Sequence, residues 1–294
     1  MDVAVVVIST AAIAGAVAAF MVARAALPDL DDPHISRGTI RRVVTDRPLV
    51  NRLVRAFPGR GESLVEALAI AAVVVIACAF IAGITLVMIR TGTGLARADR
   101  PVADWAADRA TTRSSTVMRE ISKFGGTAYI LVGASAALVY GWWRERRWSL
   151  ALFVLVTVLG QFLVSNSIKW SVDRARPTVS QLTGFAGTSF PSGHAVAGAA
   201  VWAALALLLG RGRSRPVRGA LFGLAVGLGV AVAGTRVALG VHWTTDVIVG
   251  LVIGWSWFAV CALLFGGRRL RPAEPLIIAR QAAENAPTAA SGDP

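Results

Sequence analysis

The 294-residue sequence is poor in cysteine, lysine and histidine. Its 2 cysteines, Cys78 and Cys261, fall in separate apolar runs, and neither has a partner at a spacing typical of a metal site. This excludes a disulfide framework and a cysteine metal centre, and we interpret both residues as small buried hydrophobes. Lysine occurs only at Lys123 and Lys169, so arginine supplies nearly all of the 30 basic side chains.

Charged residues are also scarce, whereas apolar residues are abundant and come in blocks. Only 16% of the residues are charged, 55% are hydrophobic and the mean hydropathy is +0.62, which is far more apolar than an ordinary soluble domain. Helical blocks of ~15–25 residues can mostly cross a hydrocarbon core of ~30 Å. A large soluble helical core would need polar faces, which these blocks lack. The seven predicted spans are Val3–Leu27, Val65–Ile89, Thr127–Trp143, Trp148–Asn166, Ala195–Gly210, Gly219–Ala233 and Val247–Phe265.

The distribution of positive charge supports a membrane protein. A formal net charge of +13 is also typical of proteins that bind nucleic acid. Here, however, the arginines stand in short connections beside apolar spans, as the positive-inside rule describes. We therefore expect a multi-pass protein of the plasma membrane whose partner is the lipid bilayer, with no role for nucleic acid. The connections expected in the cytoplasm contain Arg144, Arg146 and Arg147, then Arg211, Arg213, Arg215 and Arg218, and finally Arg268, Arg269 and Arg271.

The chain divides into four predicted regions. No basic residue precedes the first apolar block, so we expect a membrane anchor with its N-terminus outside, rather than a cleaved signal peptide. An apolar stripe from Val50 to Phe57 at helical spacing predicts a basic helix on the cytoplasmic membrane surface. The small and polar residues after Pro272 predict a disordered tail. The regions are 1–27 (anchor), 28–64 (basic interfacial segment), 65–266 (six-span core) and 267–294 (cytoplasmic tail).

The connection 90–125 contains one further predicted helix, on the outer side. Ser114 or Ser115 can cap it, and Val117, Ile121 and Phe124 form an apolar stripe along it. Two interpretations fit this pattern. The helix is either a lid or access element for a site, or an interfacial helix that shields the backbone of the loop.

Three polar segments interrupt the apolar pattern near the ends of spans. They read SIKWSVDRARP (167–177), PSGH (191–194) and GTRVALGVHWTTD (234–246). Between His194 and Arg236 the chain makes one predicted hairpin, so two crossings return it to the side from which it left. All three segments therefore lie at one outer mouth of the bundle, where their basic groups run against the positive-inside trend.

These segments contain groups that suit a phosphate. Lys169, Arg176 and Arg236 offer N–H donors and positive charge to tetrahedral oxygens. Ser192 and Gly193 precede a helix, whose free N–H groups and positive dipole end point to the same place. Glycine also allows the backbone to approach an oxyanion closely.

Two histidines and an aspartate add catalytic chemistry. His242 and Asp246 are one helical turn apart, so their side chains can touch, and the carboxylate can fix the imidazole tautomer needed in a base or nucleophile. His194 can protonate a leaving group. Singly, residues of this kind are more often caps, snorkelling cations or headgroup anchors. Their joint occurrence on one face predicts a phosphoryl-transfer site that needs no metal.

At these residues the sequence resembles the type 2 phosphatidic acid phosphatase family, the membrane relatives of vanadium haloperoxidases. The family pattern is Lys-x6-Arg-Pro, then Pro-Ser-Gly-His, then Ser-Arg-x5-His-x3-Asp. This chain has Lys169 to Pro177, Pro191 to His194, and Thr235-Arg236 to Asp246, with all three spacings matched. The resemblance covers roughly residues 65–266. It implies an all-α, polytopic membrane helix bundle with a six-span phosphatase core, to which this chain adds one N-terminal span.

The resemblance also implies a role for each motif residue. His242 would attack phosphorus and form a phosphohistidine, Asp246 would orient it, and His194 would protonate the departing oxygen. No metal or other cofactor is implied. Thr235 replaces the usual serine and keeps its hydroxyl, so its phosphate contact is the least secure. The implied phosphate-binding residues are Lys169, Arg176, Ser192, Gly193, Arg236 and Thr235.

The substrate expected from this reading is a lipid phosphate or diphosphate at the outer leaflet. Arginine and alanine with almost no lysine are typical of a high-GC bacterium, where polyprenyl diphosphate recycling is a natural role. Phosphatidic acid and phosphatidylglycerol phosphate remain alternatives, because the motifs recognise phosphate and not the lipid tail. Phosphotransfer to another hydroxyl would use the same residues. A lipid-phosphate transporter is disfavoured, because few polar groups cross the spans. The sequence does not determine the oligomeric state.

Overall fold

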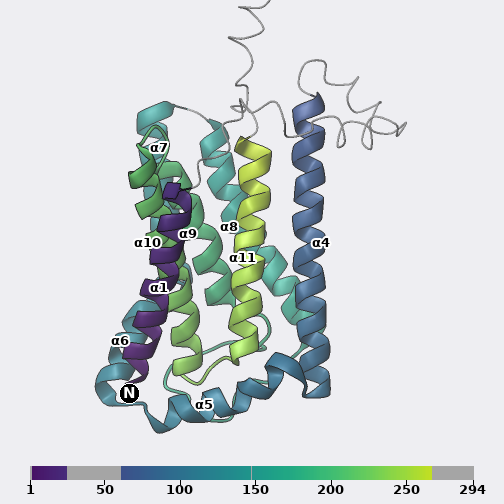
Figure 1. The fold of residues 1–294 in the computed structure, drawn as a ribbon, viewed down its shortest axis with the longest axis vertical. Helices are drawn as coiled ribbons and strands as arrows, with labels where there is room; N and C mark the ends of the chain where they lie inside the picture. The colour runs from purple at the N-terminus through teal and green to yellow at the C-terminus, as the bar shows by residue number, and fades with distance from the viewer. Residues whose placement is uncertain (1, 25–60, 147, 267–294) are drawn as a thin grey trace, which may run out of the picture.

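The computed structural model describes residues 2–24, 61–146 and 148–266, and in these ranges the chain is helical and has no strands (Figure 1). The predicted all-α architecture is therefore confirmed. The predicted interfacial helix around residues 50–57 and the predicted tail from residue 267 lie outside the described residues. The helices are α1 (Val3–Arg24), α4 (Gly61–Thr91), the 3-10 helix η1 (Gly94–Ala98), α5 (Asp99–Asp108), α6 (Thr112–Lys123), α7 (Thr127–Glu145), α8 (Trp148–Val172), α9 (Gly193–Leu209), α10 (Arg215–Ala238) and α11 (Thr244–Gly266).

Each of the seven predicted apolar blocks forms one helix. By length and composition, α4, α8, α10 and α11 can each cross a membrane, and a bent α6–α7 pair, with 42° between its halves, makes a fifth candidate among the described residues. The two remaining blocks, α1 and α9, are shorter apolar helices. The helices stand roughly side by side, while α5 runs across one end of the bundle (Figure 1).

At their C-terminal ends, α8 and α10 extend furthest beyond the apolar blocks that predicted them, and both extensions carry motif residues. Helix α8 continues to Val172 and so holds Lys169 in its last turn. Helix α10 continues to Ala238 and includes Thr235 and Arg236. Both ends coincide with left-handed backbone that a helix cannot accommodate: Asp173 has a φ of 45° and Gly240 a φ of 70°.

Small residues allow α9 to lie at the centre of the bundle. It packs against α8, α10 and α11, and most of its buried side chains are alanine. Contact with α11 is close, because a Cβ at Gly254 would lie 2.5 Å from the carbonyl oxygen of Val196. Close backbone approach through small residues is the usual way in which helices associate in membranes. The N-terminus of α9, where the PSGH segment ends, is thereby held among the helices that carry the other motifs.

Helix α1 also packs through small residues, in this case against α10. A Cβ on Gly15 would lie 2.7 Å from the carbonyl oxygen of Gly223, and one on Gly227 would lie 3.0 Å from that of Ala11. Neither position tolerates a larger side chain without separating the helices. The predicted additional N-terminal helix is therefore an integral part of the bundle.

The connection 90–125 folds into η1, α5 and α6 at one end of the bundle (Figure 1). The predicted short helix is confirmed as α6, but its N-cap is Thr111 and not Ser114 or Ser115. Extended backbone at Thr111 lets its hydroxyl accept a hydrogen bond from the Ser114 N–H, and Ser114 completes the capping box. Val117 and Ile121 pack with Leu239 and Val241, which belong to the third motif segment.

Both cysteines are free, as predicted. Cys261 is buried and Cys78 is half-buried. Each belongs to an apolar cluster in the bundle.

Candidate active site

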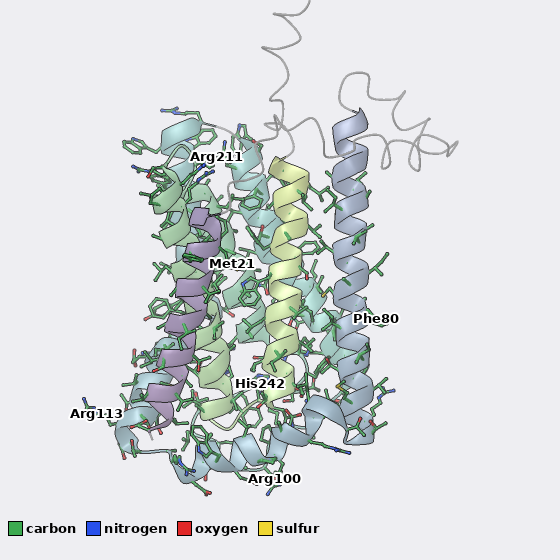
Figure 2. All side chains as sticks on the ribbon, viewed as in Figure 1. Met21, Phe80, Arg100, Arg113, Arg211 and His242 are labelled. Atoms are coloured by element: carbon green, nitrogen blue, oxygen red, sulfur yellow. The ribbon has the colours of Figure 1, made fainter. Side chains whose placement is uncertain are left out.

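The three motif segments meet at one end of the bundle. His242 lies at this end, whereas Arg211, in the arginine-rich turn between α9 and α10, lies at the opposite end (Figure 2). The start of α1 is also at the His242 end (Figure 1). The prediction that the three motif segments lie at the same end of the bundle is thus confirmed.

His242 lies in a tight turn between α10 and α11. Its N–H donates to the carbonyl oxygen of Arg236 at 3.2 Å, and only 2% of the residue is exposed. Gly240 makes the turn possible, because its φ is 70° and a Cβ there would lie 2.3 Å from the carbonyl oxygen of Ser180. This turn presents the imidazole to the interior of the site.

Asp246, on the first turn of α11, is completely buried beside His242. Its Oδ2 lies 3.5 Å from His242 Nδ1 and accepts hydrogen bonds from the Ser189 hydroxyl at 2.5 Å and the Trp243 N–H at 2.9 Å. The two side chains face each other as predicted, although the physical reason differs. Helix α11 begins only at Thr244, so the loop before it, and not a helical turn, brings His242 to the carboxylate.

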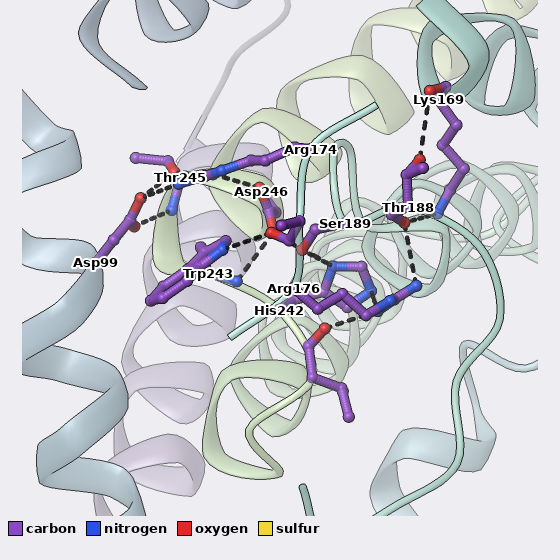
Figure 3. Close-up of polar contacts among 12 residues, drawn as sticks. Asp99, Lys169, Arg174, Arg176, Thr188, Ser189, His242, Trp243, Thr245 and Asp246 are labelled. Carbon is purple, nitrogen blue, oxygen red and sulfur yellow. Dashed lines mark hydrogen bonds and ion pairs between the residues drawn. The ribbon is translucent and has the colours of Figure 1, made fainter. Parts of the chain in front are cut away.

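Arg176 determines the tautomer of His242. Its Nη1 lies 3.1 Å from His242 Nε2 (Figure 3). A guanidinium can only donate, so Nε2 must be the bare nitrogen and Nδ1 carries the proton toward Asp246. Further donation by Arg176 to the carbonyl oxygens of Val241, Ala186, Gly187 and Thr188 fixes its guanidinium in place.

Burial keeps His242 neutral. Desolvation lowers its pKa to about 4, and the Arg176 and Arg236 cations act in the same direction, while Asp246 opposes them. Burial also lowers the pKa of Arg176, although an arginine keeps its charge at neutral pH. The site therefore holds an uncharged imidazole beside a cation, with the lone pair of Nε2 directed at that cation.

Lys169, Ser192 and Gly193 lie on a second side of the site. Lys169 Nζ donates to the carbonyl oxygen of Thr188 at 3.0 Å, and this oxygen also accepts from Arg176 Nη2 at 3.1 Å, so the two cations converge. A Cβ on Gly193 would lie 3.9 Å from Lys169 Cε. The Ser192 hydroxyl is buried and has no hydrogen-bond partner among the described residues.

Arg236 and Thr235 point in different directions from α10. Arg236 is 4% exposed, and its Nη1 donates to the Ser122 hydroxyl of α6 at 2.8 Å. Its Nε has no partner in the described part of the chain. The Thr235 hydroxyl instead donates to the Val232 carbonyl oxygen of its own helix at 2.6 Å. The structure thus brings Arg236 to the cluster but leaves the Thr235 hydroxyl bonded to its own helix.

His194 stands at the N-terminus of α9, against the turn that joins α6 to α7. A Cβ on Gly125 would lie 2.8 Å from the His194 carbonyl oxygen, and one on Gly126 would lie 3.7 Å from His194 Nε2. His194 and Arg236 together line a cavity of about 410 Å³, which is also lined by residues of α6 and of the first turn of α7. This cavity shares His194 and Arg236 with the cluster of motif residues.

Sequence reasoning missed a buried ionic network behind Asp246. Arg174 donates to Asp246 Oδ1 at 2.5 Å and to Asp99 Oδ2 at 2.7 Å (Figure 3). Asp99 in turn accepts from the Thr245 N–H at 2.9 Å and the Thr245 hydroxyl at 2.6 Å. Helix α5 is thereby tied to the aspartate of the third motif. The signal in the sequence that could have indicated this network was Arg174, the third basic residue of the segment 167–177.

Fold and site together define a class of protein. A bundle of helices, several of them long and apolar enough to cross a membrane, gathers three arginines, a lysine and a neutral buried imidazole at one end, and this arrangement suits a phosphoryl group. Residues 148–270, which contain all three motif segments, match the PAP2 superfamily. The predicted resemblance is confirmed, and this segment belongs to that superfamily.

Curated relatives of the chain are lipid phosphatases by name. It is 36% identical to the lipid A 1-phosphatase of Rhizobium etli over 131 residues, 38% of this chain and 52% of that one. It is 27% identical to phosphatidylglycerophosphatase B of Bacillus subtilis over 180 residues, 56% and 86% of the two chains. It is 34% identical to decaprenylphosphoryl-5-phosphoribose phosphatase of Mycobacterium tuberculosis over 139 residues, 43% and 66% of the two chains. The chain thus spans about half the length of the lipid A 1-phosphatase that it matches.

A solved structure has the same fold. The transmembrane PAP2-type phosphatidylglycerolphosphate phosphatase from Bacillus subtilis superposes with a TM-score of 0.62 at 24% identity. The superposition covers 67% of this chain and 97% of that one.

Proposed function

We propose that the protein is an integral membrane phosphatase that hydrolyses lipid phosphates or diphosphates through a phosphohistidine on His242, without a metal ion. The observation that carries this proposal is the contact between Arg176 Nη1 and the bare His242 Nε2 at 3.1 Å. The contact holds a nitrogen lone pair and a phosphate-binding cation against each other in a buried site. A phosphoryl group between the two would satisfy both.

In the first step, His242 Nε2 attacks phosphorus, and the bond from phosphorus to the leaving oxygen breaks. The Asp246 carboxylate accepts a hydrogen bond from the Nδ1–H of His242 and stabilises the positive charge that develops on the ring. His194 gives its proton to the leaving oxygen. Charge on the phosphoryl oxygens is stabilised by Lys169, Arg176 and Arg236, together with the Ser192 hydroxyl and the free N–H at Gly193.

In the second step, a water molecule attacks the phosphohistidine. His194, now neutral, takes a proton from this water, the P–N bond breaks and the electron pair returns to Nε2. Inorganic phosphate is released, and both histidines regain their starting states. The overall reaction consumes one water molecule and requires no redox partner.

The lipid class is proposed from the position of the site and from the relatives. Phosphate-binding groups at the end of the bundle suit a lipid whose tail remains in the bilayer. The relatives are named for lipid A, phosphatidylglycerophosphate and decaprenylphosphoryl-5-phosphoribose. These lipids differ from one another, and the feature that they share is a phosphate group. We propose polyprenyl diphosphate as the first substrate, with phosphatidic acid and phosphatidylglycerol phosphate as the alternatives.

We also propose that the site faces outward from the plasma membrane. The arginine-rich turn between α9 and α10 is at the end opposite His242, and such turns stay in the cytoplasm by the positive-inside rule. Single cysteines introduced at Arg100 and Arg213 test this orientation in intact cells. A membrane-impermeant thiol reagent should label position 100 and spare position 213; the reverse pattern contradicts the proposal.

Phosphate release by the purified protein tests the proposed reaction. A panel of lipid phosphates is offered in detergent with EDTA to wild type, His242→Ala and, as a matched control, His34→Ala, the histidine outside the three motif segments. We expect release that survives EDTA, is kept in His34→Ala and falls at least about 10³-fold in His242→Ala. Loss on EDTA treatment would overturn the metal-free mechanism. Equal release by His242→Ala would overturn the nucleophile.

A further inference from the structure

The cavity beside His194 has features beyond those needed for the scissile phosphate. We call it the leaving-group cavity and define it by His194, Arg236, Ser122, Arg119, Lys123 and the first residues of α7. Its volume is about 410 Å³. Because His194 both lines this cavity and protonates the departing oxygen in the proposed reaction, the cavity lies where the leaving group must be.

The N-terminal end of α7 forms part of the lining of this cavity. Residues 126–129, which are the N-cap Gly126 and the first turn, all line it. Gly126 provides no side-chain cap, so the N–H groups of the first turn lack the partner that a capping side chain supplies. Uncapped N–H groups at the positive end of a 19-residue helix attract an anion.

Cationic side chains around the cavity indicate an anion independently of the helix. Arg236 is 96% buried, since only 4% of it is exposed, and its Nε has no hydrogen-bond partner among the described residues. On α6, Lys123 is paired with Glu120 at 2.6 Å, whereas the exposed Arg119 has no hydrogen-bond or ion-pair partner in the described ranges. Two donors that line the same cavity therefore remain uncompensated.

We propose that the leaving-group cavity binds a second phosphate of the substrate, beyond the phosphate that is removed. The proposal rests on the proposed function and narrows its substrate class to lipids whose leaving group is itself anionic. Such a second phosphate is the inner phosphate of a lipid diphosphate or a phosphodiester in the headgroup. Phosphatidic acid has neither, so its leaving group is the uncharged diacylglycerol.

The proposed assignment gives each donor one task. The scissile phosphate occupies the cluster of Lys169, Arg176 and His242. The second phosphate faces the first turn of α7 and Arg119. Arg236 lies between them, with Nη1 fixed on Ser122 and Nε free, and so can contact the oxygen that links the two groups.

Substrate preference in purified full-length protein tests the proposal. The ratio of kcat/KM for a two-phosphate lipid to kcat/KM for phosphatidic acid is measured in wild type, Arg119→Gln and Arg113→Gln. Arg113 is an exposed arginine on the same helix that does not line the cavity. We expect Arg119→Gln to lower the ratio about tenfold, mainly through KM, as the loss of one charge-assisted hydrogen bond would. Arg113→Gln should leave it unchanged.

A backbone variant tests the helix terminus. Thr127 is the first residue of α7, where proline is well tolerated, and Gly126 has φ −78° and ψ 153°, which a following proline accepts. Thr127→Pro removes one N–H donor, and Thr127→Ala is the control for the lost hydroxyl. We expect a lower ratio in Thr127→Pro than in Thr127→Ala. The ratio is measured separately with polyprenyl diphosphate and with phosphatidylglycerol phosphate as the two-phosphate lipid. A decrease with the first alone indicates that the cavity binds the inner phosphate of a diphosphate, and a decrease with the second alone indicates that it binds a headgroup phosphodiester.

Binding separates failure of this inference from failure of the proposed function. Inorganic pyrophosphate and orthophosphate are titrated into His242→Ala, with and without Arg119→Gln. Tighter binding of pyrophosphate that disappears with Arg119→Gln supports the cavity even if wild type hydrolyses none of the lipids. Active wild type with equal ratios in all variants, together with equal binding of the two anions, overturns the inference and leaves the phosphatase intact.

Discussion

Arg174 is the residue whose removal should most disturb the site without touching the reacting atoms. It bridges Asp246 and Asp99, whose side chains are 0% and 5% exposed. Arg174→Gln keeps a polar head but removes the positive charge. Both buried carboxylates then lose their cation, although Thr245, Ser189 and Trp243 still donate hydrogen bonds to them.

The expected cost follows from burial. Removing one partner of a buried ion pair destabilises a protein by about 3–5 kcal/mol, because the remaining charge is uncompensated. The retained hydrogen bonds favour the lower end of this range. Arg100→Gln is the matched control, since its pair with Asp104 is exposed, at 65% and 46% for the two side chains, and such pairs contribute less than about 1 kcal/mol.

Equilibrium unfolding in mixed micelles, followed by tryptophan fluorescence, compares the two variants with wild type. We expect Arg174→Gln to lose at least about 2 kcal/mol more than Arg100→Gln. Its kcat should also fall, because Asp246 no longer holds its position beside His242. Equal unfolding free energies in the two variants would refute the view that this network stabilises the site.

Four further predictions concern the site and the helix packing that supports it. Because burial lowers the pKa of His242 to about 4, kcat/KM should fall as the pH decreases through about 4, and a limb near 6.5 common to several substrates would contradict this. The same depressed pKa means that His242 contributes stability above about pH 6.5 that is lost progressively between pH 6.5 and about 4, which unfolding at several pH values checks. Gly15→Val should destabilise the bundle by about 1–3 kcal/mol by forcing α1 away from α10, whereas Gly83→Val, with no atom within 4 Å of its Cβ, should not. Gly240→Ala should lower kcat by displacing the His242 turn, and Gly92→Ala, which has positive φ but open space, should cost stability alone.

Much of the fold could be predicted because each apolar block can be recognised from its own residues. Counting the blocks then shows at which end of the bundle each connection lies. Seven blocks gave seven helices, and an even number of crossings placed the three motif segments at one end. The ends of α8 and α10 were less predictable, since polar residues such as Lys169 and Arg236 continue a helix until left-handed backbone stops it.

Long-range contacts limited what could be predicted about the site. Asp99 and Arg174 are 75 residues apart, and Arg174 and Asp246 are 72 apart, so no periodicity or motif links them. The direction of the Thr235 hydroxyl also depends on the local helix backbone, which accepts its hydrogen bond. Motif spacing identified which residues gather at the mouth, while packing decides which of their atoms are available.

The central claim, a covalent phosphohistidine on His242, is tested most directly by trapping the intermediate. Wild type, His242→Ala and His34→Ala are mixed with a lipid phosphate labelled with ³²P in the scissile phosphate, and the reaction is quenched in alkali, which preserves phosphohistidine. The account predicts label on the wild type and His34→Ala proteins, lost on brief acid treatment, and none on His242→Ala. Phosphate release without any trapped label during the first turnover, or equal label on His242→Ala, would contradict it.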